Sequence, residues 1–174
     1  MITNEAIERV RGWFTGRVPD EWQVAPVDVV VDREEIIVGL TVADVDLPQD
    51  TSEAELEEAR SGRAKAFRED TRGKRMTIAQ EAQRRFDRMV SWQVTVGDRT
   101  ELFTHVAAPV MTRLRQPQRQ VLDTLVDAGV ARSRSEALGW CVRLVGQHED
   151  DWLGELREAM STVADVRAKG PGSA

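Results

Sequence analysis

The sequence predicts an α+β fold: a small antiparallel sheet with helices, followed by a strand-helix-helix unit and a C-terminal helix. Three observations support this class. Residues 27–42 and 91–106 each contain two β-rich runs separated by a short polar turn, which is typical of a hairpin. The segments around them carry apolar residues at helical spacing. With 174 residues, 41% of them hydrophobic, the chain is long enough to bury a core.

The first predicted helix covers residues 4–14, and Gly16 and Pro19 end it. Thr3 or Asn4 precedes the helix and is suited to cap its first free N–H groups. The apolar residues of this segment share one helical face: Ile7, Val10, Trp13 and Phe14.

Two hairpins form the predicted sheet. In the first, strands at residues 27–31 and 36–42 are joined by a four-residue polar link, and a proline-containing loop follows at 45–52. In the second, residues 91–96 alternate between apolar and polar side chains, and 101–106 form the partner strand after a Gly-Asp turn. We expect the two hairpins to make one antiparallel sheet.

Residues 53–88 are highly charged and predict one long helix broken near residues 71–73, or two helices. One hypothesis is a phosphate-contacting surface. The alternative is a solvated helix that balances the acidic N-terminal segment. Both readings concern the same basic residues: Arg60, Arg63, Lys65, Arg68, Arg72, Lys74 and Arg75.

The net charge of −6 is unevenly distributed along the chain. Residues 1–59 hold 15 acidic and 4 basic side chains, whereas residues 60–88 hold 4 acidic and 10 basic ones. An excess of basic residues in the middle of the chain is compatible with nucleic-acid binding, although the net charge of the whole chain is negative. The acidic first segment is suited to a basic protein partner. Arginine far outnumbers lysine, which indicates a GC-rich bacterial genome.

The sequence lacks the residue patterns that several kinds of chemical site need. Cys141 is the single cysteine, so the chain forms no internal disulfide, and a reducing cytoplasm is expected. His105, expected in a strand, and His148, expected at a helix end, are far apart, and Gly12 and Gly16 do not form a phosphate loop. Neither a signal peptide nor a membrane span is predicted. We therefore expect a non-enzymatic protein without metal or cofactor.

The segment from Val110 to Val145 is the most informative part of the chain. Residues 110–114 are too short for a helix and are closed off by Pro117, so an extended strand is predicted. A helix follows over 118–128, and Gly129 is placed for a left-handed cap. The apolar residues of this helix are Val121, Leu122, Leu125 and Val126.

After Gly129, Ser133 or Ser135 can cap a second helix. Its apolar positions cover one broad face: Ala137, Leu138, Trp140, Cys141, Leu144 and Val145. Residues 150–166 then predict a last amphipathic helix, which could cover a dimer core.

The strand-helix-helix order, with Arg113-Leu114 closing the strand and a Ser-Arg-Ser-Glu-Ala run opening the second helix, resembles the ribbon-helix-helix DNA-binding family. The resemblance covers roughly 36 of the 174 residues. It implies that two chains pair their strands into a ribbon that enters the major groove.

By position, the resemblance implies that Met111 and Arg113 face the bases, while Val110 and Leu114 point into the dimer core. The backbone amides near Ser133, Arg134 and Ser135 would hold a phosphate, and the charges of Arg132 and Arg134 would assist. Arg115 and Arg119 would touch the flanking DNA backbone.

The sequence thus predicts an N-terminal α+β module over 1–106 and a ribbon-helix-helix-like unit with the C-terminal helix over 107–170. The expected function is a cytoplasmic, homodimeric DNA-binding protein, either a transcriptional regulator or a nucleoid-associated factor. The alternative is a protein-interaction or assembly factor that uses the C-terminal helices only to dimerise. A third hypothesis, RNA or nucleoid binding, uses residues 60–88 instead.

Overall fold

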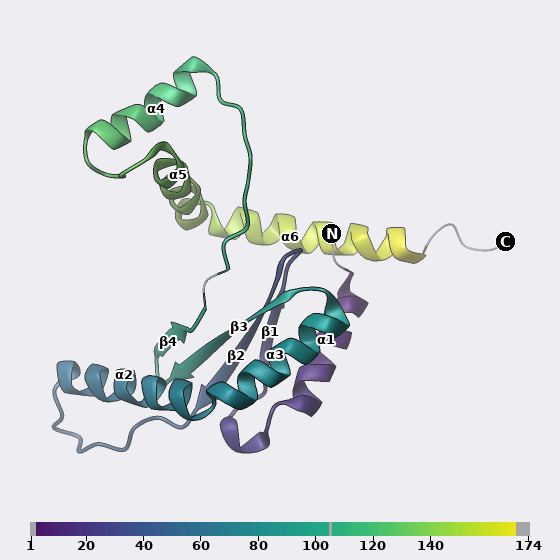
Figure 1. The fold of residues 1–174 in the computed structure, drawn as a ribbon, viewed down its shortest axis with the longest axis vertical. Helices are drawn as coiled ribbons and strands as arrows, with labels where there is room; N and C mark the ends of the chain where they lie inside the picture. The colour runs from purple at the N-terminus through teal and green to yellow at the C-terminus, as the bar shows by residue number, and fades with distance from the viewer. Residues whose placement is uncertain (1–2, 105, 170–174) are drawn as a thin grey trace. The chain divides into compact units, whose positions relative to one another are not determined.

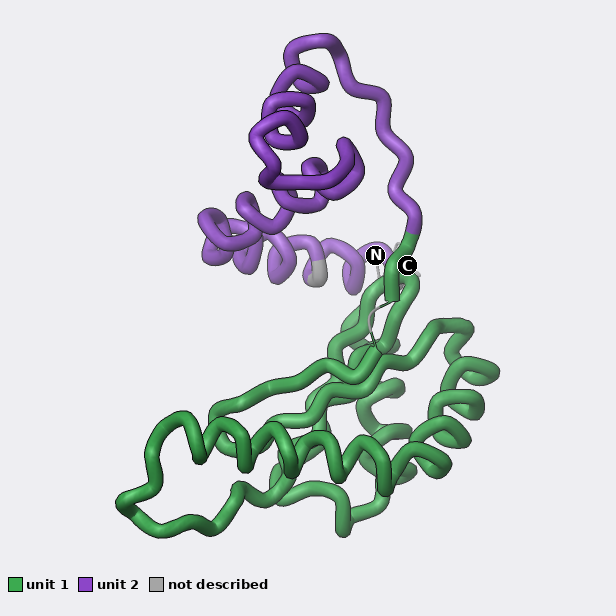
Figure 2. The backbone as a smooth tube through the Cα atoms, turned by 60° about the vertical axis from the view of Figure 1, so that its left-hand side comes forward, with its two compact units in different colours: residues 1–108 green, residues 109–174 purple. Residues whose placement is uncertain are grey.

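A computed structural model describes residues 3–104 and 106–169 of the chain. The chain divides into two compact units, residues 1–108 and 109–174, shown in green and purple in Figure 2. This division lies two residues from the boundary that the sequence places after residue 106. The α+β class is confirmed, with one sheet and several helices (Figure 1). None of the described helices is both long and apolar enough to cross a membrane.

Unit 1 begins with helix α1 (Asn4–Arg17), whose start is capped by Thr3. The Thr3 hydroxyl accepts a hydrogen bond from the backbone N–H of Ala6 at 3.3 Å. The predicted helix is confirmed, and it extends past residue 14 by almost one turn before Val18 returns to extended backbone. A short 3₁₀ helix, η1 (Asp20–Trp22), then leads to the sheet.

The sheet contains strands in the order β1 (Asp28–Val31), β2 (Glu35–Val42), β3 (Met89–Val96) and β4 (Arg99–Leu102). Both predicted hairpins are confirmed, because β1 pairs antiparallel with β2, and β3 antiparallel with β4. The prediction of a wholly antiparallel sheet is wrong.

Strands β2 and β3 are parallel neighbours along their full length, so the sheet is mixed. The physical reason is the long connection between them. Two parallel strands need a crossover that brings the chain back to the end of the sheet where the first strand began. Two helices form this crossover here. The predicted strand at 101–106 is also shorter and shifted, since β4 ends at Leu102, and His105 lies outside the described residues.

The crossover consists of α2 (Glu53–Asp70) and α3 (Arg72–Phe86), so the predicted break in the basic segment is confirmed at Thr71. The Thr71 hydroxyl donates to the carbonyl of Phe67 at 2.5 Å. The same hydroxyl accepts from Nε of Arg75 at 2.8 Å. Side-chain bonds to the backbone of this kind compete with the regular helical pattern and bend it.

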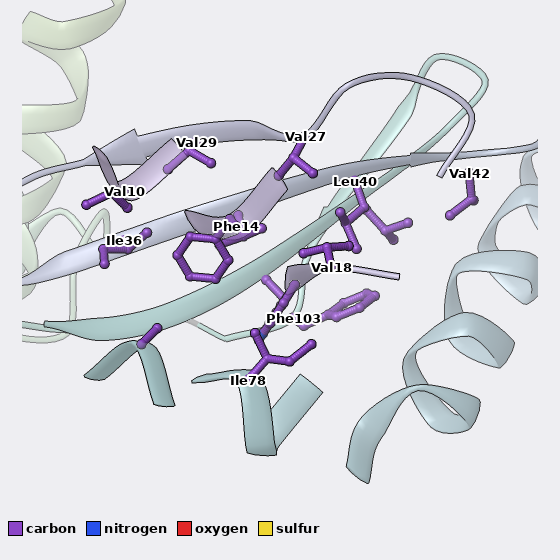
Figure 3. Close-up of a cluster of buried hydrophobic side chains, with 14 of the residues drawn as sticks. Val10, Phe14, Val18, Val27, Val29, Ile36, Leu40, Val42, Ile78 and Phe103 are labelled. Atoms are coloured by element: carbon purple, nitrogen blue, oxygen red, sulfur yellow. The ribbon is translucent and has the colours of Figure 1, made fainter. Parts of the chain in front are cut away.

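The core of unit 1 lies on one face of the sheet, where alternate residues of β2 and β3 point inward. Helix α1 contacts β1, α3 contacts β3, and α2 contacts β3 and β4. Figure 3 shows Phe14, Leu40 and Ile78 among the side chains that fill this layer. Trp22 and Trp92 pack edge to face with ring centroids 6.3 Å apart, which agrees with a packing role for these tryptophans.

Unit 2 contains α4 (Gln116–Asp127), α5 (Arg134–His148) and α6 (Asp150–Lys169), so the three predicted helices are confirmed. Gly129 ends α4 with φ +75°, the left-handed conformation expected of it. The chain between β4 and α4 departs from the prediction. Residues 110–114 form no regular strand in the single chain, because no strand within residues 3–104 or 106–169 pairs with them.

Candidate nucleic-acid interface

The segment immediately before α4 is unusually exposed for its composition. Met111 is 100% exposed and Val110 is 85% exposed, and Arg113 also lies in solvent. Arg113 forms neither a hydrogen bond nor an ion pair with any other described residue. Leu114 is half-buried and packs against the core of unit 2. Residues 110–113 thus present two apolar side chains and one cation to solvent.

The start of α4 is fixed by two local hydrogen bonds. The side-chain oxygen of Gln118 accepts from the backbone N–H of Arg115 at 2.8 Å, and Pro117 occupies the first turn. Arg119 donates from Nη1 to the carbonyl of Leu114 at 2.7 Å. The extended segment therefore enters the helix at a defined angle, while the Arg115 side chain remains in solvent.

The start of α5 forms the second part of the candidate interface. Ser133 is the cap, because its hydroxyl accepts from the backbone N–H of Glu136 at 3.2 Å. Ser135, the other predicted cap, lies exposed in the first turn instead. An open hollow there is lined by Arg132, Ser133, Ser135, Glu136, Gly139 and Arg143.

Arg143 is a basic residue of this hollow that the sequence prediction missed. Its signal is present in the sequence, since Ser135, Gly139 and Arg143 recur every four residues and so share one face of α5. Met111, Arg113 and Arg115 do not line the hollow. The predicted site residues thus fall into two groups, one just before α4 and one around the start of α5.

Two of the predicted phosphate-binding arginines already bind carboxylates. Arg134 donates to both oxygens of Asp123, from Nε at 2.6 Å and from Nη2 at 2.8 Å. These hydrogen bonds lower the pKa of Asp123 below its usual value. Arg132 similarly pairs with Glu136 at 3.2 Å and lowers the pKa of that carboxyl. Each of these arginines keeps further N–H donors for a phosphate, but the carboxylate that it already binds opposes the approach of a second anion.

The basic helices of unit 1 are less available to a nucleic acid than their charge indicates. Arg60 donates to both oxygens of Asp44, at 3.0 and 2.7 Å, and also binds Asp98. Lys74 lies 3.7 Å from a carboxylate oxygen of Glu21. The acidic and basic segments therefore neutralise each other in part within unit 1.

The sequence analysis includes Arg75 in an exposed basic surface, and this prediction is wrong. Arg75 is only 6% exposed, because its side chain turns inward at the break between α2 and α3. Burial, together with the charges of Arg68 and Arg72, lowers the pKa of Arg75 to about 10. Arg68 and Arg72 themselves remain exposed, as does Lys65.

Comparison with known proteins places both units in one family. Residues 8–102 match the family described as Rv1265-like protein, N-terminal domain, and residues 115–167 match the Mb1296 C-terminal domain. The chain is 57% identical to the uncharacterized proteins Mb1296 of Mycobacterium bovis and Rv1265 of Mycobacterium tuberculosis. Each alignment covers 91% of this chain and 69% of the relative.

The family matches do not include ribbon-helix-helix proteins, and no solved structure matches the chain. The two matched domains coincide with the two units: the first ends within β4 and the second begins one residue before α4. The chain belongs to the family of Rv1265-like proteins.

Proposed function

We propose that the protein is a dimeric DNA-binding protein whose unit 2 supplies both the dimer contact and the DNA contact. The observation that carries this proposal is the exposed segment at 110–113, with which no strand of the described residues pairs. Arg113 ends this segment, and Arg115, at the start of α4, also faces solvent. The segment precedes two helices joined through a left-handed glycine and a serine cap. A second copy of the segment would satisfy its free backbone groups as an antiparallel strand pair.

The small core of unit 2 supports a dimer. Its hydrophobic cluster contains three buried residues, Leu122, Ala131 and Ala137, with five partly buried neighbours. Larger apolar side chains on α5 and α6 stay in solvent, among them Val142 (65% exposed) and Trp152 (55% exposed). Exposed apolar side chains in such numbers indicate a surface that another protein covers.

The proposed DNA contacts of unit 2 are of two kinds, because some of its arginines bind a carboxylate and others do not. Arg113 has no carboxylate partner among the described residues, so it is free to donate two hydrogen bonds to a guanine edge. Arg134 is held by Asp123, so its contribution to phosphate binding is reduced by this competitor. The proposal therefore assigns base readout to Met111 and Arg113, and backbone contact to Arg115, Arg132 and Arg134 with the Ser133–Ser135 amides.

The test is a titration of the 174-residue chain with duplex DNA selected from a random pool. Arg113→Ala should reduce discrimination between the selected and a scrambled duplex by about 1–3 kcal/mol. Asp123→Asn releases Arg134 from its carboxylate. This variant should bind every duplex more strongly. The logarithm of its binding constant should also fall more steeply with the logarithm of the salt concentration, by the release of about one more counterion.

Arg9→Ala is the matched control, because Arg9 is an exposed arginine on α1 of unit 1. It should leave both affinity and discrimination unchanged. The proposal fails if the protein binds no duplex at low salt, or if Arg113→Ala and Arg9→Ala behave alike.

The second candidate is a protein-interaction or assembly factor. The exposed apolar side chains of α5 and α6 favour it as well, since they need a protein partner whether or not DNA binds. The dependence of binding on salt concentration distinguishes the two functions. A contact based on arginine and phosphate weakens steeply as salt rises, whereas a mainly apolar contact does not.

A further inference from the structure

A hollow in unit 1, remote in sequence from the DNA-binding segment, has the composition of an anion site. Its volume is about 530 Å³, within the range of about 300–1,000 Å³ that is usual for small-molecule sites. Helix α2, the first residue of α3 and strand β4 contribute the lining: Ser61, Lys65, Arg68, Glu69, Arg72 and Glu101. Three of these side chains are cations, and none of the three forms an ion pair with a described carboxylate.

Arg75 adds a buried positive charge beside this hollow. Its Nη2 donates to the carbonyl of Arg68 at 2.6 Å, and its guanidinium carbon lies 4.8 Å from the centre of the Phe103 ring. The guanidinium of Arg68 contacts the same ring at 5.5 Å. Arg68, which lines the hollow, and Arg75 thus share one aromatic side chain.

Arg75 is unlike the other partly enclosed arginines of unit 1. Arg17 binds Glu81, Arg60 binds Asp44, and Arg99 binds Glu57. Arg75 is more deeply buried than these, yet no described carboxylate neutralises it. Burying an arginine near two other cations is costly unless an anion compensates for the charge. The arrangement of Arg68, Arg72 and Arg75 is therefore suited to a ligand that brings negative charge.

The carboxylates of the hollow favour a small ligand over a nucleic-acid backbone. Glu69 and Glu101 also line it, and they would repel the successive phosphates of a polyanion. The same carboxylates can accept hydrogen bonds from hydroxyl or amine groups beside a single phosphate. Arginine and lysine together are the side chains that most often bind phosphate oxygens.

We propose that this hollow binds the phosphate group of a small soluble phosphorylated molecule, with Lys65, Arg68 and Arg72 contacting the phosphate oxygens and Arg75 supporting them from behind. The site lies wholly within unit 1. The inference therefore stands independently of the DNA-binding function proposed for unit 2.

The test titrates the full chain with inorganic pyrophosphate and, separately, with inorganic phosphate. Isothermal titration calorimetry measures the binding of each probe. Sodium chloride at matched ionic strength is the reference. Pyrophosphate should bind at one site per chain, and Arg72→Gln should weaken the binding at least about tenfold, because it removes one charge-assisted contact. Arg72 is exposed, so this variant should fold normally.

Arg84→Gln is the matched control, since it removes the same charge from an exposed position on the same helix, outside the hollow. It should leave pyrophosphate binding unchanged. The proposal is overturned if neither probe binds more strongly than chloride, or if both variants weaken binding equally. It is also overturned if Arg72→Gln weakens duplex DNA binding and leaves pyrophosphate binding intact, which would make the hollow part of a nucleic-acid surface. Arg113→Ala, which tests the DNA function, should not affect pyrophosphate.

Discussion

At the scale of single residues, arginine has three different roles in this chain. Arg17 and Arg60 link distant segments of unit 1 by binding Glu81 and Asp44. Arg75 is buried at the helix break, and Arg113 is free in solvent. The sequence shows the charge of each residue but not its partner, because Arg17 and Glu81 are far apart along the chain. A count of charges therefore overstates the basic surface that is open to nucleic acid.

The turn between β3 and β4 provides a prediction at this scale. Gly97 has φ +61°, and a Cβ atom added there would collide with the guanidinium of Arg60. That guanidinium is held in place by Asp44 and Asp98, and the Arg60 side chain is 13% exposed. Gly97→Ala should therefore lower the free energy of unfolding by about 1–2 kcal/mol, measured by urea denaturation.

Gly12→Ala is the control for this substitution. Gly12 lies within α1, and an added Cβ meets no atom within 4 Å. Since alanine favours helix over glycine, this variant should raise the free energy of unfolding by about 0.5–1 kcal/mol. Equal effects of the two variants would contradict the role assigned to the Gly97 turn.

At the scale of elements, the cap of α5 decides how the second helix of unit 2 begins. The Ser133 hydroxyl accepts from the N–H of Glu136, while Glu136 in turn accepts from the backbone N–H of Arg132 at 2.8 Å. Ser133→Ala should lower the free energy of unfolding of unit 2 by about 1 kcal/mol. Circular dichroism during thermal unfolding of the full chain measures this change.

Ser135→Ala separates the loss of the cap from the loss of any hydroxyl nearby. Ser135 lies two residues further on, and its hydroxyl forms no hydrogen bond with a described residue. Alanine has the higher helix propensity, so this variant should be neutral or slightly stabilising. If Ser135→Ala proves the more damaging of the two, the assignment of the cap is wrong.

The sequence predicted most elements but not how they join. The helices and hairpins depend on local patterns, such as the alternation in β2 and the glycine after α4, and these patterns were sufficient. The parallel pairing of β2 with β3 depends on contacts between residues more than 50 positions apart, which no local pattern encodes. For the same reason the inward turn of Arg75 was missed. Met111 and Arg113 are exposed, and their contact with DNA bases stays a prediction.

At the scale of the whole molecule, the two units differ in how well each buries its own apolar residues. Unit 1 has a core of sixteen buried hydrophobic residues between its sheet and helices. The corresponding cluster of unit 2 contains three among its described residues. A domain with so small a core is marginal without a partner. From this contrast we expect unit 1 to fold independently, and we propose that a second copy stabilises unit 2.

Val110 provides the sharpest prediction about assembly, because it is 85% exposed in the single chain and is assigned to the dimer core. Sedimentation equilibrium should give twice the 19.5 kDa chain mass for the unmodified protein. Val110→Asp should shift this to the monomer mass, since burying an unpaired carboxylate in the paired strands costs several kcal/mol. Val24→Asp, an equally drastic change at a 67% exposed position of unit 1, should leave the dimer intact. A Val110→Asp variant that remains dimeric would place the contact on another surface, with the exposed side chains of α5 and α6 as the next to test.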